Sequence, residues 1–480
     1  MKDMSLSNIC QYANYYHSPI HKKNIKFECK ENSLNSGFCK YHDENYLPGH
    51  EDEIKSEIKE KLEQCEQFGL PFECVGYHLP ELDLENLEFS VSINFIDVKF
   101  HGEIIFDYTK FKKYVVFSDS VFYENASFNN SEFFDNLIFQ RNKSQNILFR
   151  YSKFKKNSDF RNTKFEDSSF FSCEFSQSDF SECEFINSVS FSSCIFKMET
   201  DFIDSVFKDQ VNFSSSKFYQ EVKFINIIFQ NKVSFHNVEF FEPKLVHIDG
   251  DLSMASFLNT DLSRVHFENN VVWNNSPQSG KFSKFNQCRF VIFDEILLEN
   301  NEPNLDLNSV LDVYRNLREN YDYYLRYDDA GEFFIREMEL KRKFSQTTSL
   351  AGSQTSKKNR VFSRFSITGW YGLLSQYGHS ILRPLISSSI IFTFFLIFFL
   401  TNNFCDFKPI LELNFELLSK CQIGNFDEVF DRTISGFFPF YTLYNGNLVT
   451  SDIVLRLLML PISGMFFISL KRKLERKFRH

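Results

Sequence analysis

Phenylalanine recurs at a fixed spacing through the central part of the chain. Its positions are five or six residues apart, mostly in alternation, from Phe89 to Phe240, with one longer step between Phe139 and Phe149. An amphipathic helix would repeat its apolar positions every three or four residues, and a simple strand every two, so neither explains the pattern. An internal repeat of this kind indicates a solenoid of stacked coils.

The residue two places before almost every one of these Phe residues is small or β-branched. Such positions include Ile93, Val98, Ile104, Thr109, Val115, Ser120, Ala126, Ser131, Cys173, Ser178, Cys183, Val189 and Cys194. A square coil needs this pattern, because the large residue at the centre of each side fills the axis and its small neighbour points inward at the corner. Four sides give a coil of about 21 residues, and such coils stack at ~4.8 Å. The three Cys residues in this set are interpreted as small core residues and not as metal ligands.

This pattern resembles the pentapeptide-repeat family in its Phe-centred variant. The resemblance implies an all-β right-handed quadrilateral β-helix, which we assign to residues 81–300. The longer step, around RNKSQN, is expected to form a bulged corner or loop. After Phe240 the pattern degrades (Phe257, Leu262, Phe267), which indicates a last coil and a cap.

Four candidate metal ligands lie in residues 1–44, namely Cys10, Cys29, Cys39 and His42. The stretch GFCKYHDE places a thiol and an imidazole three residues apart, a spacing that suits a tetrahedral ion. The four residues resemble the short Cys-Cys-Cys-His zinc knuckles found ahead of some repeat domains, which implies a structural zinc ion. The alternative is an unstructured tail with incidental Cys and His. In a reducing cytosol a metal is favoured over a disulfide.

The segments on either side of the repeats have helical patterns. Residues 45–80 are expected to form a helical cap and linker, with a charged helix at 51–66 that hides the strand edges of the first coil. Residues 303–344 show apolar positions at three-and-four spacing and predict a helical hairpin. This part resembles the YRxLR…AGEFFxREM segment that follows the repeats in membrane-bound pentapeptide proteins. Residues 345–360 are polar and predict a flexible linker.

Residues 361–480 are expected to form a membrane domain with two spans. The chain carries no charge from Pro384 to Cys405, which is long enough to cross ~30 Å of hydrocarbon. Ile453–Leu470 is the second expected span, with Arg456 snorkelling to the interface; the alternative for it is an interfacial helix.

The distribution of charged residues around the spans predicts their orientation. Basic residues precede the first span and follow the second, whereas acidic residues dominate the loop between them. The positive-inside rule therefore predicts a multi-pass protein of the inner or plasma membrane, with both termini cytoplasmic. The first residues contain no apolar run, so we expect no signal peptide.

The loop between the spans contains an apolar segment interrupted by Gly, Pro and Asn. It resembles the pore helix and filter of two-span ion channels, because such backbone is tolerated at membrane depth only inside protein or beside water. The filter position would be the run Thr442, Leu443, Tyr444, Asn445 and Gly446. A potassium filter reads TVGYG, so potassium selectivity is not expected.

Cys405 and Cys421 are the two Cys residues of the same loop. Thiols outside the membrane meet an oxidising environment in which disulfides persist. We predict a disulfide between them, and two unrelated thiols are the alternative.

Composition and the absence of catalytic motifs argue against two classes of function. The net charge of −10 argues against a surface that coats nucleic acid. No catalytic constellation is visible, so we do not expect an enzyme.

The leading hypothesis is an oligomeric membrane pore, embedded in lipid, with the β-helix as a cytoplasmic sensor or scaffold. One hairpin cannot enclose a pathway, so a homo-oligomer is required, with a tetramer favoured.

Two alternatives to a pore stay open. The first is a membrane-tethered scaffold that conducts nothing and binds a protein partner through the β-helix. The second is a DNA mimic, because the repeat region also resembles the pentapeptide proteins that protect topoisomerases.

Overall fold

The computed structural model describes residues 9–18, 23–274, 290–303, 305–344, 366–402, 426–437 and 450–478. The chain divides into two compact units, which we describe in turn. The first contains Met1–Ser276 and Arg289–Tyr324, and the second contains Pro277–Cys288 and Leu325–His480.

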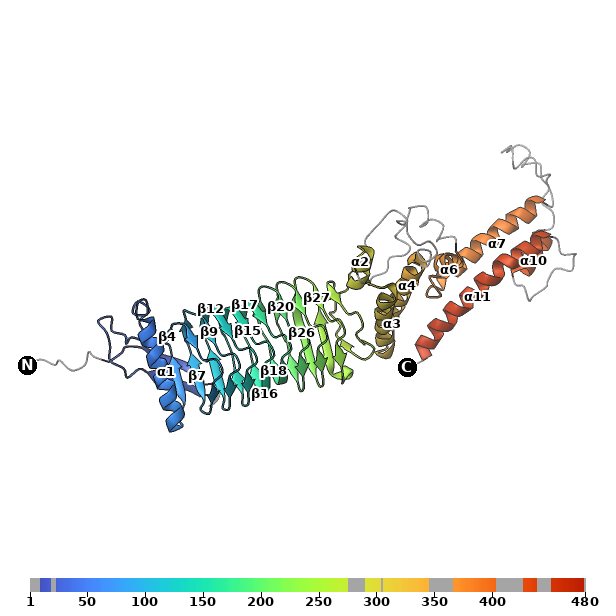
Figure 1. The fold of residues 1–480 in the computed structure, drawn as a ribbon. Helices are drawn as coiled ribbons and strands as arrows, with labels where there is room; N and C mark the ends of the chain where they lie inside the picture. Colours follow the sequence, from blue (N-terminus) through green and yellow to red (C-terminus); the bar gives the residue numbers. More distant parts are fainter. Residues whose placement is uncertain are drawn as a thin grey trace, which may run out of the picture. The chain divides into compact units, whose positions relative to one another are not determined.

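The first unit is built around a β-solenoid of about nine turns that spans residues 72–267 (Figure 1). Its strands pair in parallel with the strands one coil before and one coil after them, so that Phe111 pairs with both Phe89 and Phe133. Most strands are two residues long, because each side of the coil has only a short extended stretch. The longer ones are β3 (Phe72–Val75), β7 (Ile93–Ile96), β11 (Val115–Ser118), β12 (Val121–Ser127), β15 (Lys143–Leu148), β16 (Lys153–Asp159), β17 (Lys164–Ser169), β18 (Glu174–Asp179), β26 (Val222–Phe229) and β29 (Val246–Gly250).

The Phe residues of the repeat fill the solenoid axis and confirm the predicted fold class. Rings one coil apart lie nearly parallel, with centroids 4.7 Å apart for Phe154 and Phe175 and 4.6 Å apart for Phe185 and Phe207. Aromatic rings at such separations contribute contact energy beyond their buried area. The small corner residues are buried beside them, and the Cys173 thiol donates a hydrogen bond to the Phe149 carbonyl, 2.6 Å away.

The bulge expected around RNKSQN lies in the neighbouring strand, because β12 has one extra residue opposite this stretch and the register shifts between Phe122 and Asn125. Residue 144 keeps its place in the ladder, and Ser144 in β15 pairs with both Phe122 and Phe165. The missing ring is therefore a substitution at position 144, and the register of β15 against the following strand β17 is unchanged. The Phe139 ring lies over the gap, parallel to Phe122 at 5.6 Å and to Phe165 at 6.3 Å.

The solenoid begins earlier than the expected residue 81. Its first strand, β3, and the next, β4 (His78–Leu79), lie within the segment that we expected to be a helical cap and linker. Cys74 pairs with Phe95 and Leu79 pairs with Phe100, so smaller apolar residues occupy the axis of this coil. The Phe period therefore does not reveal the first coil.

An α-helix covers the start of the solenoid, as expected. Helix α1 (Glu51–Phe68) lies beside β3 and β4 (Figure 1) and buries Ile54, Ile58 and Leu62 on one face. It ends at Gly69, which has the left-handed backbone (φ +66°) that favours glycine after a helix. The covered edge is protected from pairing with another chain.

Among the described residues, the last strand of the solenoid is β31 (His266–Phe267), and the expected β-helix region up to residue 300 ends in a helix, α2, that begins at Phe293. Two helices follow in this unit, α2 (Phe293–Glu299) and α3 (Leu307–Tyr323). Their side chains satisfy backbone groups of the final coils. The Asn320 amide donates to the carbonyls of Leu262 and Val265, 2.6 Å from each. Helical side chains thus replace the next coil as hydrogen-bond partners.

Asp294 of α2 makes a buried contact of the same kind. Its carboxylate accepts hydrogen bonds from the Phe257 backbone N–H, at 3.0 Å, and from the Ser256 hydroxyl. Burial raises the pKa of Asp294 to about 6. The unfolded value is about 3.9, so between these values the folded chain binds more protons and its stability falls as the pH rises.

Replacing Asp294 by Asn should remove this pH dependence. An amide can accept from Phe257 and donate to Ser256, and it does not ionise. The free energy of unfolding of the variant minus that of the parent should therefore rise by about 2 kcal/mol between pH 4 and pH 7. Denaturant titrations of the two proteins at both pH values measure this, and a difference that stays constant would contradict it.

The second unit is helical. Its helices are α4 (Tyr327–Phe344), α6 (Ile367–Ser375), α7 (Leu382–Asn402), α10 (Phe426–Phe437) and α11 (Thr450–Phe478). Helices α7 and α11 are long and apolar enough to cross a membrane, over Leu382–Phe399 and Ile453–Glu475. Pro461 lies inside α11, where it removes one backbone hydrogen bond.

Candidate metal centre and membrane segment

A two-stranded hairpin brings the first two candidate ligands together. Strands β1 (Ala13–Ser18) and β2 (Lys23–Glu28) pair antiparallel, so Cys10 before β1 and Cys29 after β2 lie at the same end. The Cys10 backbone N–H donates to the Glu31 carbonyl at 2.9 Å, which extends this pairing. The sequence gap between the two cysteines is therefore closed by backbone hydrogen bonds.

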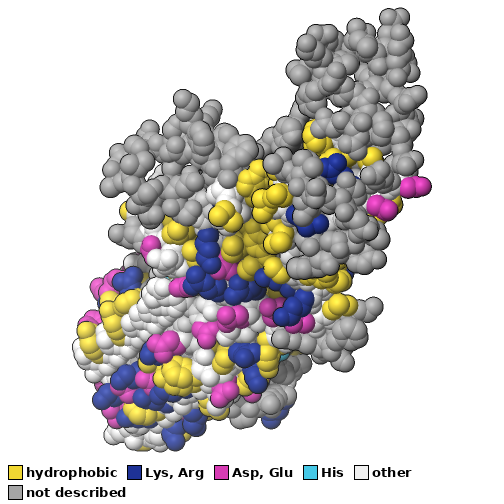
Figure 2. Space-filling view, turned by 90° about the vertical axis from the view of Figure 1, so that its right-hand side faces the viewer, with side chains coloured by type: hydrophobic (Ala, Val, Ile, Leu, Met, Phe, Trp, Pro, Cys, Tyr) yellow, Lys and Arg dark blue, Asp and Glu magenta, His cyan; other side chains and the backbone are white. Residues whose placement is uncertain are grey.

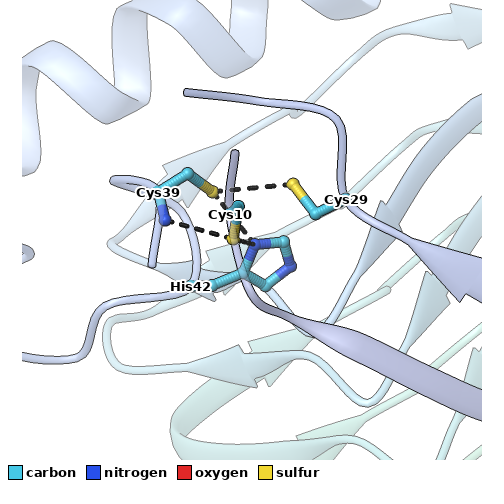
Figure 3. Close-up of side chains that lie close together, drawn as sticks. All are labelled: Cys10, Cys29, Cys39 and His42. Atoms are coloured by element: carbon cyan, nitrogen blue, oxygen red, sulfur yellow. Dashed lines mark hydrogen bonds between the residues drawn. The ribbon is translucent and has the colours of Figure 1, made fainter. Parts of the chain in front are cut away.

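The other two ligands come from the turn before α1. The His42 N–H donates to the Cys39 carbonyl at 3.0 Å, so a tight turn sets both side chains on one side. All four side chains converge (Figure 3), and their ligand atoms lie within 4.8 Å of one another. We call Cys10, Cys29, Cys39 and His42 the metal centre.

The distances within the metal centre fit a tetrahedral ion. His42 Nδ1 lies 3.4 Å from Cys10 Sγ and 3.0 Å from Cys39 Sγ, and the sulfurs of Cys29 and Cys39 are 3.8 Å apart. An ion with metal–sulfur bonds of about 2.3 Å and metal–nitrogen bonds of about 2.0–2.1 Å separates its ligands by about 3.5–3.8 Å. The cluster therefore needs little rearrangement to hold a metal.

The first solenoid coil orients the imidazole. His42 Nε2 donates to the Val75 carbonyl at 2.8 Å, which leaves Nδ1 free of a proton and directed at the thiols. The ring is stacked on Tyr12, with centroids 4.0 Å apart, and meets Tyr77 edge-on at 5.2 Å. Tyr12 is held in turn by a 2.7 Å hydrogen bond to Asp97.

Burial makes the metal centre unfavourable for charge in the absence of a cation. It raises the pKa of the Cys39 thiol to about 12, raises the pKa of Cys29 as well, and lowers the pKa of His42. A coordinated metal ion reverses this for the thiols, because a metal-bound thiol is deprotonated outright. The donor set and its burial therefore fit a bound metal, which this cluster could hold.

In the second unit, α10 packs against both candidate spans, which also contact each other. An apolar cluster joins Phe395 and Phe399 of α7, Val429 of α10, and Leu455 and Met459 of α11. Figure 1 shows α10 alongside the ends of α7 and α11 that are joined by the intervening segment. A short helix thus lies against both spans near one end of the hairpin.

The opposite ends of the spans are tied to α4. The Tyr377 hydroxyl, from the turn between α6 and α7, donates to Glu339 of α4 at 2.6 Å. Arg472 of α11 donates to the Tyr377 carbonyl at 2.7 Å, and its guanidinium lies over the Phe334 ring of α4. Movement of α4 would therefore displace the ends of both spans.

The sequence-predicted sites have different outcomes. The structure brings Cys10, Cys29, Cys39 and His42 together as predicted. The predicted filter, residues 442–446, and the predicted disulfide pair, Cys405 and Cys421, lie outside the described residues. Both stay predictions. Sequence reasoning missed a second cluster, which contains His247, His266 and Glu268.

Comparison with known proteins agrees with the repeat architecture. The family model for pentapeptide repeats (9 copies) matches residues 149–195 and 170–217. Comparison with curated proteins gives no match. The matched residues form consecutive coils of the Phe-centred solenoid, between β15 and β25 (Lys217–Phe218). The chain therefore contains pentapeptide repeats in a Phe-centred β-solenoid, and it has two C-terminal helices apolar enough to cross a membrane.

Proposed function

We propose that this protein forms an oligomeric membrane pore whose solenoid is a cytoplasmic sensor or scaffold. The observation that carries the proposal is the packing of α10 against both α7 and α11 through the cluster around Val429. A short helix that packs against two spans and precedes a segment with the predicted filter sequence is the arrangement expected of a pore loop.

The exposed surface of the spans supports assembly. Ile390, Phe394, Leu457 and Phe467 are each 63–68 % exposed in the single chain. In a membrane such side chains face lipid or another copy of the chain. One hairpin cannot enclose a pathway, so we propose a cyclic homo-oligomer, most simply a tetramer.

A flux measurement tests the pore. Full-length protein reconstituted in lipid vesicles should pass small ions, and Val429→Asp should abolish this flux because it places a charge in the apolar cluster. Asp427→Asn, an exposed change on the same helix, is the matched control and should retain the flux. Unchanged oligomer size and solenoid melting would show that the Val429 variant is folded. Absence of flux from the parent protein would refute the pore and favour the scaffold.

The proposed topology places both termini in the cytoplasm, because basic residues flank the two spans. A cysteine introduced as Lys473→Cys, at an exposed position near the end of α11, should not react with a membrane-impermeant maleimide in intact cells. It should react fully once the membrane is opened. Peptide mass spectrometry separates this site from the native cysteines, and labelling from outside would contradict the topology.

We propose that the metal centre holds one structural zinc ion. Its three thiols and one imidazole form a closed tetrahedral set, which is the usual composition of structural zinc sites. Elemental analysis of the full chain should give about one zinc, and Cys39→Ser with His42→Ala should lose it. The matched control, Cys65→Ser with His50→Ala, changes the same residue types outside the cluster. Zinc retained by the first pair of changes would overturn the assignment.

The solenoid surface gives a second role for this domain. Tyr108, Tyr123, Tyr151, Tyr219 and Phe241 are 40–55 % exposed on its outside, which is suited to a protein partner. A membrane-tethered scaffold is therefore the alternative function.

The acidic side chains do not favour DNA mimicry. Several of them are paired with lysines of neighbouring coils, as in Glu184 with Lys208 (2.5 Å) and Glu132 with Lys153 (3.5 Å). Figure 2 shows basic and acidic side chains intermixed on the face that it displays. A surface that imitates the phosphate backbone of DNA needs unpaired negative charge. We therefore do not propose that the solenoid acts as a DNA mimic.

A further inference from the structure

We propose that His247, His266 and Glu268 form a second metal site, which takes a divalent transition-metal ion at the surface of the last solenoid coils. The three side chains, which we call the His–Glu cluster, are partly exposed, and their ligand atoms lie within 4.8 Å of one another. This site is separate in sequence and chemistry from the metal centre, because it contains no thiol.

Strand register builds the His–Glu cluster. His247 in β29 pairs with His266 in β31, so the two imidazoles project from neighbouring coils. Glu268 follows His266 by two residues and therefore projects from the same face of the chain. Its backbone N–H donates to the Ile248 carbonyl at 2.9 Å, which continues the parallel pairing up to the ligand. The backbone thus fixes the three side chains without help from a metal.

The distances match those between ligands of one ion. Glu268 Oε1 lies 3.3 Å from His247 Nδ1 and 3.3 Å from His266 Nε2. A tetrahedral ion with metal–nitrogen and metal–oxygen bonds of about 2.0–2.2 Å separates such ligands by about 3.3–3.5 Å. Two imidazoles and one carboxylate leave a fourth position for water, and imidazole favours zinc, copper, nickel or cobalt over magnesium or calcium.

The basic side chains near the His–Glu cluster interact with other groups, so their charges do not prevent a cation from binding. Lys223 precedes His247 by one coil and pairs with it in register. Its ammonium lies 3.5 Å from Asp201 and 3.4 Å from Glu221, so its charge is offset by two carboxylates. On the other side, the Arg264 guanidinium lies over the Tyr323 ring, 3.9 Å from its centroid.

A metal at this position would join the last coils of the solenoid. The His266 ring meets Tyr324 edge-on at 5.1 Å, and the Tyr324 hydroxyl donates to the Arg264 carbonyl at 2.9 Å. An ion shared by the coils of β29 and β31 would therefore lie beside Tyr324, the residue that follows α3. Because the cluster is partly exposed and has three protein ligands, we expect its metal to exchange with solvent more readily than that of the metal centre.

Cobalt titration of the full-length protein tests the proposal. The metal centre is first filled with one equivalent of zinc, and Co²⁺ is then added and followed by visible absorption and equilibrium dialysis. A second equivalent should bind with the d–d bands of a tetrahedral nitrogen and oxygen site, and without the thiolate charge-transfer band that cobalt at the metal centre would give.

Variants decide the outcome. His266→Gln and Glu268→Gln should each weaken binding of this second equivalent at least tenfold. The control His236→Gln, which changes another partly buried solenoid histidine, should leave it unchanged. Glu268→Gln keeps the size and hydrogen-bonding capacity of the side chain, so loss of cobalt with an unchanged circular dichroism spectrum separates ligand loss from misfolding. A parent protein that binds no second equivalent, or variants that bind it as tightly as the parent, would overturn the proposal and leave a simple histidine–glutamate ion pair.

Discussion

Removal of metal from the metal centre is expected to unfold the segment that precedes α1. A two-stranded hairpin such as β1–β2 is marginally stable in water without further support. The binding free energy of a structural zinc ion, about 10–16 kcal/mol in small zinc modules, is then largely folding free energy. Without the ion, no bond links the buried thiols of Cys10, Cys29 and Cys39 to one another.

The effect should extend to the helix that covers the first coil. Lys40 and Tyr41, beside the ligand Cys39, both contact Glu57 of α1, with the tyrosine hydroxyl 2.8 Å from the carboxylate. Hydrogen exchange of the full chain, measured with and without a strong chelator, should show lost protection over residues 9–50 and partial loss over α1. The coils beyond residue 110 should keep their protection, because a solenoid coil interacts mainly with its neighbours.

The double variant Cys39→Ser with His42→Ala should reproduce the chelator pattern without chelator. The pair Cys65→Ser with His50→Ala should not, since neither residue belongs to the cluster. Full protection of residues 9–50 in the metal-free protein would show that the hairpin and the stacking of Tyr12 on His42 suffice without an ion.

The repeat architecture was predictable because a solenoid coil requires one large apolar residue per side. Prediction failed where another residue stands at the Phe position. Leu79 stands in place of Phe in the first coil, and Ser144 stands in place of Phe in the middle of the ladder. At both positions, parallel backbone hydrogen bonds to adjacent coils keep the residue paired with the Phe positions of its neighbours. The fold therefore tolerates the absence of Phe at a position where the sequence pattern would require it.

The ligands of the metal centre were predictable from residue type and spacing, whereas their surroundings were not. The Val75 carbonyl that fixes His42 belongs to the first coil, far from the cluster in sequence. The His–Glu cluster was missed because His247 and His266 are 19 residues apart (266 − 247), fewer than the 22 that separate Phe89 from Phe111. A coil of irregular length cannot be placed in register without the structure.

Truncation of Phe165 to Ala is expected to lower the free energy of unfolding by ~3–5 kcal/mol, mainly through the cavity that it leaves. The ring is fully buried and lies parallel to Phe185, with centroids 5.0 Å apart. On its other side the ladder already lacks a ring, because Ser144 is there, and the buried Ser144 hydroxyl has no hydrogen-bond partner among the described residues. Phe139 already covers part of this gap, so no neighbouring ring is free to fill a second one.

Phe241→Ala is the matched control, because Phe241 is 47 % exposed and stacks on Tyr219 outside the solenoid. Its loss should cost less than ~1 kcal/mol, since it leaves no cavity. Denaturant titration of the full-length protein, followed by circular dichroism, gives both values. Because each coil is stabilised by its neighbours, the Phe165 variant should also unfold less cooperatively, with hydrogen exchange fastest around β15 and β17. Equal costs for the two substitutions would mean that Phe165 does not lie on the axis of the solenoid.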